Sequence, residues 1–307
     1  MPAFCSHYLF FRDSEKFIKA AADFELNESV CSLGSQGADI FFFHKIYSPF
    51  RSLRKIGSAF HRAKPEDILN TFAQYIKKKP DPVAKSYAYG FILHYALDRR
   101  CHPYVYALEK KITDRDKKIH RASAHNRVEA GLDAYMLHLK LNEEHPYMFD
   151  SYKTISLSDD EKSEVAKLLR YTVKRVLKKN IRKASVIKAI DDIAKVQKIL
   201  QDKSGRLFAV STTAENILSS LIGYYKISAM IKPRLWKNGE KYANINNGAW
   251  VNPFSVETSY LSFEQLYIYA LQEAQELIVG FEQKLGDNPD ADNITNNLSF
   301  LTGLEII

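Results

Sequence analysis

The segment DPVAKSYAYGFILHYALDRRCHPYV, residues 81–105, predicts more about the fold of this chain than any other stretch. Asp81 is a good helix cap, and Pro82 suits the first turn of a helix, where a missing amide hydrogen costs no internal hydrogen bond. Pro103 removes an amide donor and disfavours helical geometry at the residue before it. The segment therefore predicts one helix that begins after Asp81 and ends at about His102.

Residue types that bind metals recur on this helix at intervals of four, at His94, Asp98 and His102. Four residues make one helical turn plus about 40°, so His94 and Asp98 project from nearly the same face. His102 follows one turn later, at the expected end of the helix. An imidazole and a carboxylate on one face can bind the same cation, and zinc prefers such ligands. His125 and Glu129 repeat the spacing on the next expected helix.

The spacing alone leaves two interpretations open. The chain has 9 His, and roughly one pair of a His and an acidic residue four positions apart is expected by chance. A single His on an apolar helix is more often a hydrogen-bonded core residue than a metal ligand. These positions therefore indicate a metal site only if other residues support it.

Cap and turn signals divide the rest of the chain into further helices. Few segments show the alternation of apolar and polar residues that is typical of a β-strand. Ser158 and Glu161 form a capping box before a long helical run. Residues 234–262 are rich in Asn, Gly and Pro and predict a long ordered loop, a type of segment that often carries function. The pattern predicts an all-α fold, with a single multi-helix domain over residues 1–307. The other expected helices cover residues 65–79, 116–141, 207–231 and 263–285.

The composition indicates a globular protein, because 46% of the residues are hydrophobic and 26% are charged. The N-terminus lacks the basic start and apolar run of a signal peptide, and no stretch approaches about 18 apolar residues. We therefore expect a cytoplasmic protein. Cys5, Cys31 and Cys101 have no framework spacing, and we expect them to be buried thiols rather than disulfide partners.

The charge balance favours anionic partners, because the net charge is +8. Residues 167–190, called the basic segment below, contain nine Lys or Arg and no acidic residue. This segment is either a solvated helix face or a surface that attracts anionic lipid or nucleic acid.

Six motifs extend the pattern of metal-binding residues over much of the chain. They are PAFCSH (residues 2–7), LGSQGADIFF (33–42), GSAFHR (57–62), HYALDRRCHPYV (94–105), HNRVE (125–129) and WVNPFSVETSYLSFEQLYIYALQEAQELI (250–278). In this order they resemble the zinc-dependent phospholipase C family, whose more distant relatives are the fungal single-strand-specific nucleases. The resemblance is strongest over residues 1–130 and weak through the basic segment. It implies an all-α fold and a site for two or three zinc ions.

The resemblance also implies metal ligands, residue by residue. His7 and Asp98 match part of a third zinc site, with Asp98 as the bridge, and Pro2 would complete this site through its amine if Met1 is removed. The gap between Asp98 and His102 is shorter than in the secreted enzymes of the family. The ligands implied for the first zinc are Asp39, His61, His94 and Asp98, and those for the second are His102, His125 and Glu129.

The activity that the resemblance implies is hydrolysis of a phosphate ester by zinc-activated water that attacks phosphorus in line. Asp39 is the best candidate to orient or deprotonate this water while also binding metal. A phospholipid head group is the expected substrate, with peripheral contact to an anionic membrane. Phe4 and Cys5 occupy the stretch where a choline-specific enzyme is expected to carry an acidic residue, so phosphatidylcholine is not assigned.

Two alternatives remain open. The same zinc chemistry would serve a nuclease or nucleotidase that acts on single-stranded nucleic acid, which the basic segment would suit. Alternatively, the chain is a catalytically idle metal-binding protein at anionic surfaces. Retention of all eight matched side-chain ligands favours an enzyme, because binding alone does not need an open metal cluster.

Overall fold

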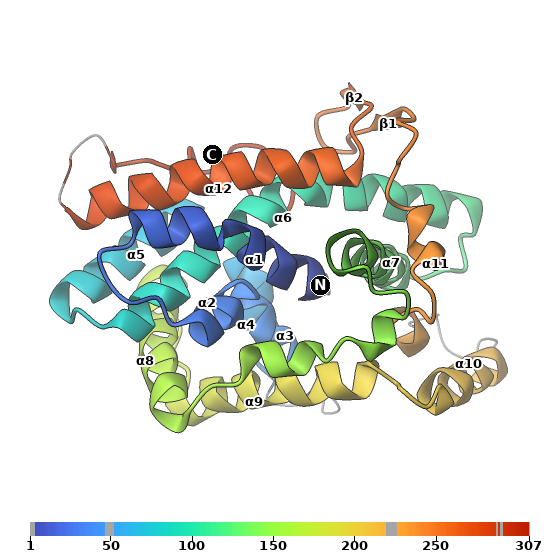
Figure 1. Ribbon diagram of the computed structural model, residues 1–307, viewed down its shortest axis with the longest axis horizontal. Coiled ribbons are helices and arrows are strands. Elements are labelled where there is room, and N and C mark those ends of the chain that lie inside the picture. The colour runs from blue at the N-terminus through green and yellow to red at the C-terminus, as the bar shows by residue number, and fades with distance from the viewer. Residues whose placement is uncertain (1–3, 47–51, 219–225, 287, 289–290, 307) are drawn as a thin grey trace.

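The structure is a computed structural model that describes residues 4–46, 52–218, 226–286, 288 and 291–306. Its regular structure is almost entirely helical, as Figure 1 shows, and the predicted all-α fold is confirmed. The helices are α1 (Phe4–Ala21), α2 (Glu28–Gly34), α3 (Ile40–Phe43), α4 (Arg54–Phe60), α5 (Pro65–Lys78), α6 (Pro82–Arg115), α7 (Arg121–Leu141), α8 (Asp159–Val176), α9 (Lys183–Leu200), α10 (Arg206–Leu218), α11 (Lys237–Glu240) and α12 (Phe263–Leu285). The shorter elements are the 3₁₀ helices η1 (Gly37–Asp39), η2 (Pro146–Met148), η3 (Ser151–Ile155) and η4 (Ile227–Met230), and the strands β1 (Trp250–Val251) and β2 (Thr258–Ser259).

Helix α6 runs through the middle of the molecule and packs against α1, α2, α7 and α12 (Figure 1). Most side chains in its N-terminal two thirds are buried. Its contact with α2 is close because two glycines meet there. A Cβ on Gly90 would lie 2.1 Å from the carbonyl oxygen of Cys31 and 2.7 Å from the Cα of Gly34. A larger residue at position 90 would push the two helices apart, so this glycine lets α2 dock deeply on α6.

The start of α6 is as predicted, but its end is not. The Asp81 side chain accepts hydrogen bonds from the amides of Val83 (2.9 Å) and Ala84 (3.3 Å), which caps the helix. The predicted end at about His102 is wrong, because the helix continues past this residue for more than three turns.

Packing explains why Pro103 does not end the helix. A proline in a helix interior costs about 3 kcal/mol, because one hydrogen bond is lost and the ring crowds the preceding turn. Pro103 and Tyr104 are both buried. The Tyr104 hydroxyl donates to the carbonyl of Tyr242 at 2.5 Å, and its ring packs 5.1 Å from the ring of Trp250. Tertiary contacts of this kind offset the local cost of the proline.

Most other predicted boundaries agree with the structure. Helix α12 covers the predicted residues 263–285, and the capping box of Ser158 and Glu161 begins α8. Helix α7 begins at residue 121 rather than at residue 116, because the His120 side chain accepts a hydrogen bond from the Ala122 amide and caps the helix there.

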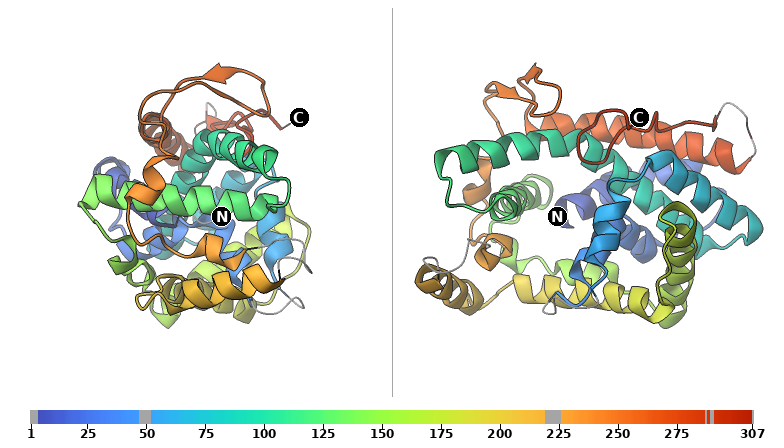
Figure 2. Two further views of the ribbon diagram at one scale, coloured as in Figure 1. Left: turned by 90° about the vertical axis from the view of Figure 1, so that its right-hand side faces the viewer. Right: turned by 180° about the vertical axis from the view of Figure 1, so that it is seen from behind.

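The segment after α9 differs from the single helix predicted over residues 207–231. Helix α10 ends at Leu218, residues 219–225 lie outside the described residues, and η4 follows as a 3₁₀ turn. The predicted loop over residues 234–262 is ordered and contains α11 and an antiparallel hairpin that pairs Trp250 with Ser259. Figures 1 and 2 show that this hairpin projects from the surface near the start of α12.

Two further predictions concern thiols and membrane spans. Cys5, Cys31 and Cys101 are free and buried, as expected, and burial raises the pKa of Cys5 to about 12. Among the helices that the structure describes, none combines the length and the apolar character that crossing a bilayer requires.

Candidate metal centre

Five parts of the chain supply the predicted metal ligands that the structure describes. His7 lies on α1, Asp39 in η1 and His61 directly after α4, while α6 and α7 supply the remaining side chains. Pro2 lies outside the described residues. The eight described ligands are all buried, and they are His7, Asp39, His61, His94, Asp98, His102, His125 and Glu129.

Asp98 lies at the centre of this group. Its Oδ1 is 3.2 Å from Nε2 of His7, and its Oδ2 is 3.3 Å from Nε2 of His94 and 3.5 Å from Nε2 of His61. Its Oδ2 is also 3.6 Å from Nδ1 of His102. One carboxylate therefore contacts imidazoles from α1, from α6 and from the residue that follows α4.

The ligand atoms form three groups, and the atoms within each group lie within 4.8 Å of one another. The grouping differs from the sequence prediction at two residues, because His94 belongs to two groups whereas Asp98, the predicted bridge, belongs to one. Neutral imidazoles and carboxylates are suitable zinc donors, so each group could hold an ion. The groups are His7 with His94 and Asp98, Asp39 with His61 and His94, and His102 with His125 and Glu129.

Three of the imidazoles are held by a hydrogen bond at Nδ1. When Nδ1–H donates to an acceptor, the lone pair of Nε2 is left to face a metal, and this second contact is typical of metal-binding histidines. The acceptors are two backbone carbonyls and one carboxylate, so the ring orientations do not depend on the metal itself. The pairs are His61 with the Gly57 carbonyl (2.9 Å), His102 with the Phe300 carbonyl (2.8 Å) and His125 with the Glu109 carboxylate (3.0 Å).

Burial and neighbouring charges shift the pKa values of the side chains in the cluster in opposite directions. Burial lowers the pKa of His61, but its contacts with Asp39 and Asp98 outweigh burial and raise the pKa to about 10. Burial dominates at His94, and its pKa falls to about 3. For Asp98, burial raises the pKa, but the neighbouring imidazoles of His102 and His94 outweigh it and hold the pKa well below the usual range. Ionised carboxylates deep in the molecule need cationic partners, and a divalent cation would serve.

Glu109 supports the centre and was missed by the sequence analysis. It is buried on α6, accepts from His125 and also accepts from Nε of Arg121 at 2.6 Å. Burial raises its pKa, but the hydrogen bonds from His125 and Arg121 outweigh burial and lower it. A negative Glu109 orients His125 and raises the basicity of its ring. Glu109 stands 16 residues before His125, so no local spacing indicates the pair.

Asp133 is the second missed residue, and it anchors the helix that carries His7. It is buried on α7, one turn after Glu129. Its Oδ2 accepts from the Cys5 amide (2.8 Å), and its Oδ1 accepts from the amide (2.8 Å) and the hydroxyl (2.7 Å) of Ser6. A carboxylate at a helix N-terminus satisfies free amides and interacts favourably with the helix dipole. The spacing of four from Glu129 was a signal that could have identified it.

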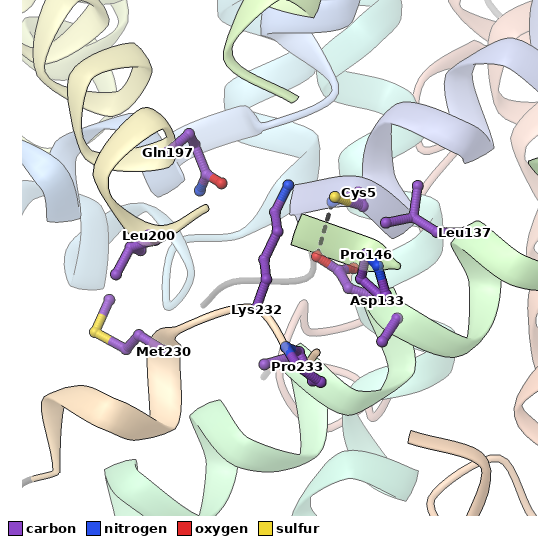
Figure 3. Close-up of a pocket in the computed structure, with 11 residues that line it drawn as sticks. Cys5, Asp133, Leu137, Pro146, Gln197, Leu200, Met230, Lys232 and Pro233 are labelled. Carbon is purple, nitrogen blue, oxygen red and sulfur yellow. Dashed lines mark hydrogen bonds between the residues drawn. The ribbon is translucent and has the colours of Figure 1, made fainter. Parts of the chain in front are cut away.

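Figure 3 shows Asp133 facing Cys5 at a small pocket between α1, α7 and α9, with Lys232 on the other side. Burial raises the pKa of Asp133 to about 6, although the hydrogen bonds from Cys5 and Ser6 oppose this shift. The Lys232 ammonium donates to Ser151 at 2.9 Å. Helix α7 therefore supplies two predicted ligands and also fixes α1 close to them.

Gly37 allows the approach of η1 to the cluster. Its φ of 52° lies in the left-handed region that favours glycine. A Cβ at this position would lie 2.1 Å from Cδ2 of His94. Gly37 therefore lets the backbone before Asp39 pack directly on the His94 ring.

The remaining four histidines lie outside the three groups, and His44, His120 and His138 have structural contacts. Nδ1 of His44 accepts from the Leu53 amide at 3.1 Å, and His120 caps α7. The His138 ring stacks on Trp236 with centroids 3.8 Å apart.

The cluster opens to solvent through a cleft of about 200 Å³. Four predicted ligands from the first two zinc sites line it, so a substrate in the cleft would reach the ligands directly. The lining residues are Asp39, His61, His102 and His125, together with Phe42, Ser58, Arg62, Tyr106 and Leu301.

An all-helical scaffold that holds a buried cluster of imidazoles and carboxylates beside a cleft is suited to bind divalent metal ions. The family model described as zinc dependent phospholipase C matches residues 6–183, which is more than half of the chain and includes all eight described ligands. The chain therefore belongs to the zinc-dependent phospholipase C family. Comparisons with curated proteins and with solved structures gave no match.

Proposed function

We propose that this chain is a phospholipase C-like phosphodiesterase that hydrolyses phospholipid head-group esters with the help of two or three zinc ions. The observation that carries this proposal is the set of three ligand groups, two of which share His94 and one of which contains Asp98, beside an open cleft. Family membership supports zinc as the metal. Bound zinc supplies positive charge beside the phosphate oxygens and lowers the pKa of coordinated water toward about 7.

Asp39 is the proposed general base. Burial raises its pKa, but contacts with His61 and His94 outweigh burial and lower it, so the carboxylate is ionised at neutral pH and can accept a proton. Its Oδ1 lies 3.2 Å from Nε2 of His61, and its side chain lines the cleft. The replacement Asp39→Asn tests the role. Retained zinc with lost turnover supports a base, whereas full activity would refute one.

Pro2 is proposed as a further ligand of the third site. The support is that Asp133 holds the first turn of α1 and that His7 on this helix contacts Asp98 at 3.2 Å. An intact-mass measurement that shows Met1 retained would exclude a Pro2 amine as ligand.

The alternative is a zinc-dependent nuclease or nucleotidase, which the basic segment would suit. A catalytically idle metal-binding protein is the third candidate. Purified protein should be analysed for zinc and then assayed on short-chain phosphatidylcholine and phosphatidylserine, a bis-nitrophenyl phosphodiester and single-stranded DNA. Cleavage of lipid without DNA supports the proposal, and the reverse supports the nuclease. Zinc binding without any turnover supports the idle protein.

A further inference from the structure

We infer that the cleft selects phosphodiester lipids whose head group carries a second anionic group, and that Arg62 recognises this group. The inference rests on the phosphodiesterase activity proposed above and names its substrate class.

Arg62 is placed for this role by its position beside the metal centre. It follows His61 directly, in a turn where its amide donates to the carbonyl of Ala59 at 3.2 Å. Its side chain lines the cleft together with Ser58, and the residue is exposed. A cation at this place can contact a substrate that also reaches the ligands on the cleft floor.

The guanidinium of Arg62 is available for a ligand. Within the part of the chain that the structure describes, it makes no hydrogen bond and no ion pair. Other arginines near the centre differ in this respect. Arg99 pairs with Glu273 at 3.0 Å, and Arg121 pairs with Glu109 at 2.6 Å. An arginine that has no acidic partner in a cleft is a candidate anion-binding group, because its planar fork matches phosphate and carboxylate oxygens.

A second cation lies on α4, the helix that contributes Ser58 to the cleft. Lys55 is exposed on α4, one turn before Ser58 and on the same face. Its ammonium has no ion pair with any described residue. The carboxylate on the cleft wall, Asp39, is already engaged by His61 at 3.2 Å. The entrance beside α4 therefore offers positive charge to an incoming substrate.

These charges select between head groups. A phosphodiester has a single negative charge, which bound metal would neutralise, so Arg62 is left to bind a second anionic group of the substrate. A serine carboxylate or a phosphate on the head group would provide one. A choline head group would instead bring a cation to a guanidinium, and it would find on the described wall no carboxylate that is free of a histidine partner. Two aromatic side chains of the cleft wall pack against histidines of the cluster. The ring centroids of Phe42 and His61 lie 5.6 Å apart, and those of Tyr106 and His125 lie 5.0 Å apart.

The test compares wild type with Arg62→Gln and Arg62→Lys, and with Arg115→Gln as a matched control. Arg115 is an exposed arginine at the end of α6, outside the cleft. Zinc-loaded proteins would be assayed on dihexanoyl phosphatidylserine, dihexanoyl phosphatidylcholine, a bis-nitrophenyl phosphodiester and single-stranded DNA. Short acyl chains keep the lipids monomeric, so that membrane binding does not enter the result.

We expect Arg62→Gln to lower kcat/KM on phosphatidylserine about tenfold, mainly through KM, because a charge-assisted hydrogen bond is lost. Activity on phosphatidylcholine and on the bis-nitrophenyl diester should stay within about twofold, Arg62→Lys should recover part of the loss, and Arg115→Gln should behave as wild type. An equal loss on both lipids, or no loss on phosphatidylserine, would overturn the inference. A loss confined to DNA would assign Arg62 to a nucleic acid phosphate and would also overturn it.

A binding measurement separates this inference from the proposed function. By calorimetry, the zinc-loaded wild type should bind phosphoserine about tenfold more tightly than phosphocholine, and Arg62→Gln should remove the difference. If no diester is cleaved but this preference is present, the proposed function fails and the anion site stands. If diesters are cleaved without the preference, the anion site fails alone.

Discussion

The metal-ligand cluster and the basic segment are both rich in ionisable residues, but they lie in opposite environments. In the cluster, all eight side chains are buried, and each contacts another ligand. In the basic segment, the Lys and Arg side chains on α8 and between α8 and α9 are exposed, those on α9 are half-buried, and contacts such as that of Lys167 with Glu164 (2.8 Å) are local. Burying a charge without a partner costs several kcal/mol, whereas an exposed charge costs little. Buried and mutually contacting ionisable groups therefore indicate function more strongly than an excess of charge does.

The largest effect is expected at Asp98, where the cluster converges. Asp98→Asn removes the charge that contacts imidazoles from three helices, so zinc content should fall by at least one ion per chain and kcat/KM by roughly a thousandfold. Elemental analysis and a phosphodiester assay measure both. Full zinc content and activity in the variant would show that Asp98 does not bridge metals.

A smaller effect is expected when Asp133, the carboxyl group that holds the N-terminus of α1, gains or loses its proton. The pKa of Asp133 is about 6 in the folded protein, above its ordinary 3.8, so the folded state binds the proton more tightly than the unfolded state. Between pH 4 and 6, the contribution of this group to stability should therefore fall as pH rises, by about 2 kcal/mol, or roughly thirtyfold in the folding equilibrium.

Asp133→Asn has no carboxyl group and should not show this change. Denaturant unfolding of both proteins at several pH values gives the difference in unfolding free energy between them, in which the other titrating groups cancel. If the wild type instead gains stability over the variant as pH rises, the three hydrogen bonds from Cys5 and Ser6 outweigh burial and Asp133 is ionised.

Glu109→Gln, which changes a residue that contacts the metal-ligand cluster, should have a moderate effect on zinc affinity. The amide still accepts from His125, but the negative charge is lost, so zinc affinity at the group of His102, His125 and Glu129 should fall about tenfold. Competition with a zinc chelator measures the affinity. Glu273→Gln removes a carboxylate that pairs with Arg99 outside the cluster and should leave zinc affinity unchanged.

The smallest effect is expected in the basic segment. Lys174→Gln combined with Lys179→Gln removes two exposed charges, and binding to phosphatidylserine vesicles should stay within about twofold of wild type. Sedimentation with vesicles measures the binding. A loss of tenfold or more would show that this face is a membrane surface and would weaken the contrast between the two regions.

How much could be predicted from sequence depended on whether the signal was local. The spacing of His94, Asp98 and His102 on one helix, joined to the family motifs, predicted the side chains that the structure brings together. The helix end predicted from Pro103 was wrong, because the contact of Tyr104 with the distant Tyr242 outweighs the local effect of a proline. That contact joins residues far apart in sequence, so no spacing could reveal it.

Glu109 and Asp133, which support the metal centre, were missed from sequence because their partners are distant in the chain. Glu109 meets His125 only because α6 extends beyond Pro103 and α7 folds back along it. Asp133 meets Cys5 and Ser6 across 128 and 127 positions of sequence. The free guanidinium of Arg62 could be noticed only after the cleft was known, because its significance lies in the absence of a partner among the described residues.

The central claim is that the three ligand groups around Asp98 hold zinc, and anomalous diffraction at the zinc absorption edge tests it most directly. Crystals of the protein purified with zinc should give two or three anomalous peaks, one of them between His102, His125 and Glu129 and the others beside Asp98. Peaks absent from all three groups, with zinc found elsewhere or not at all, would contradict the account.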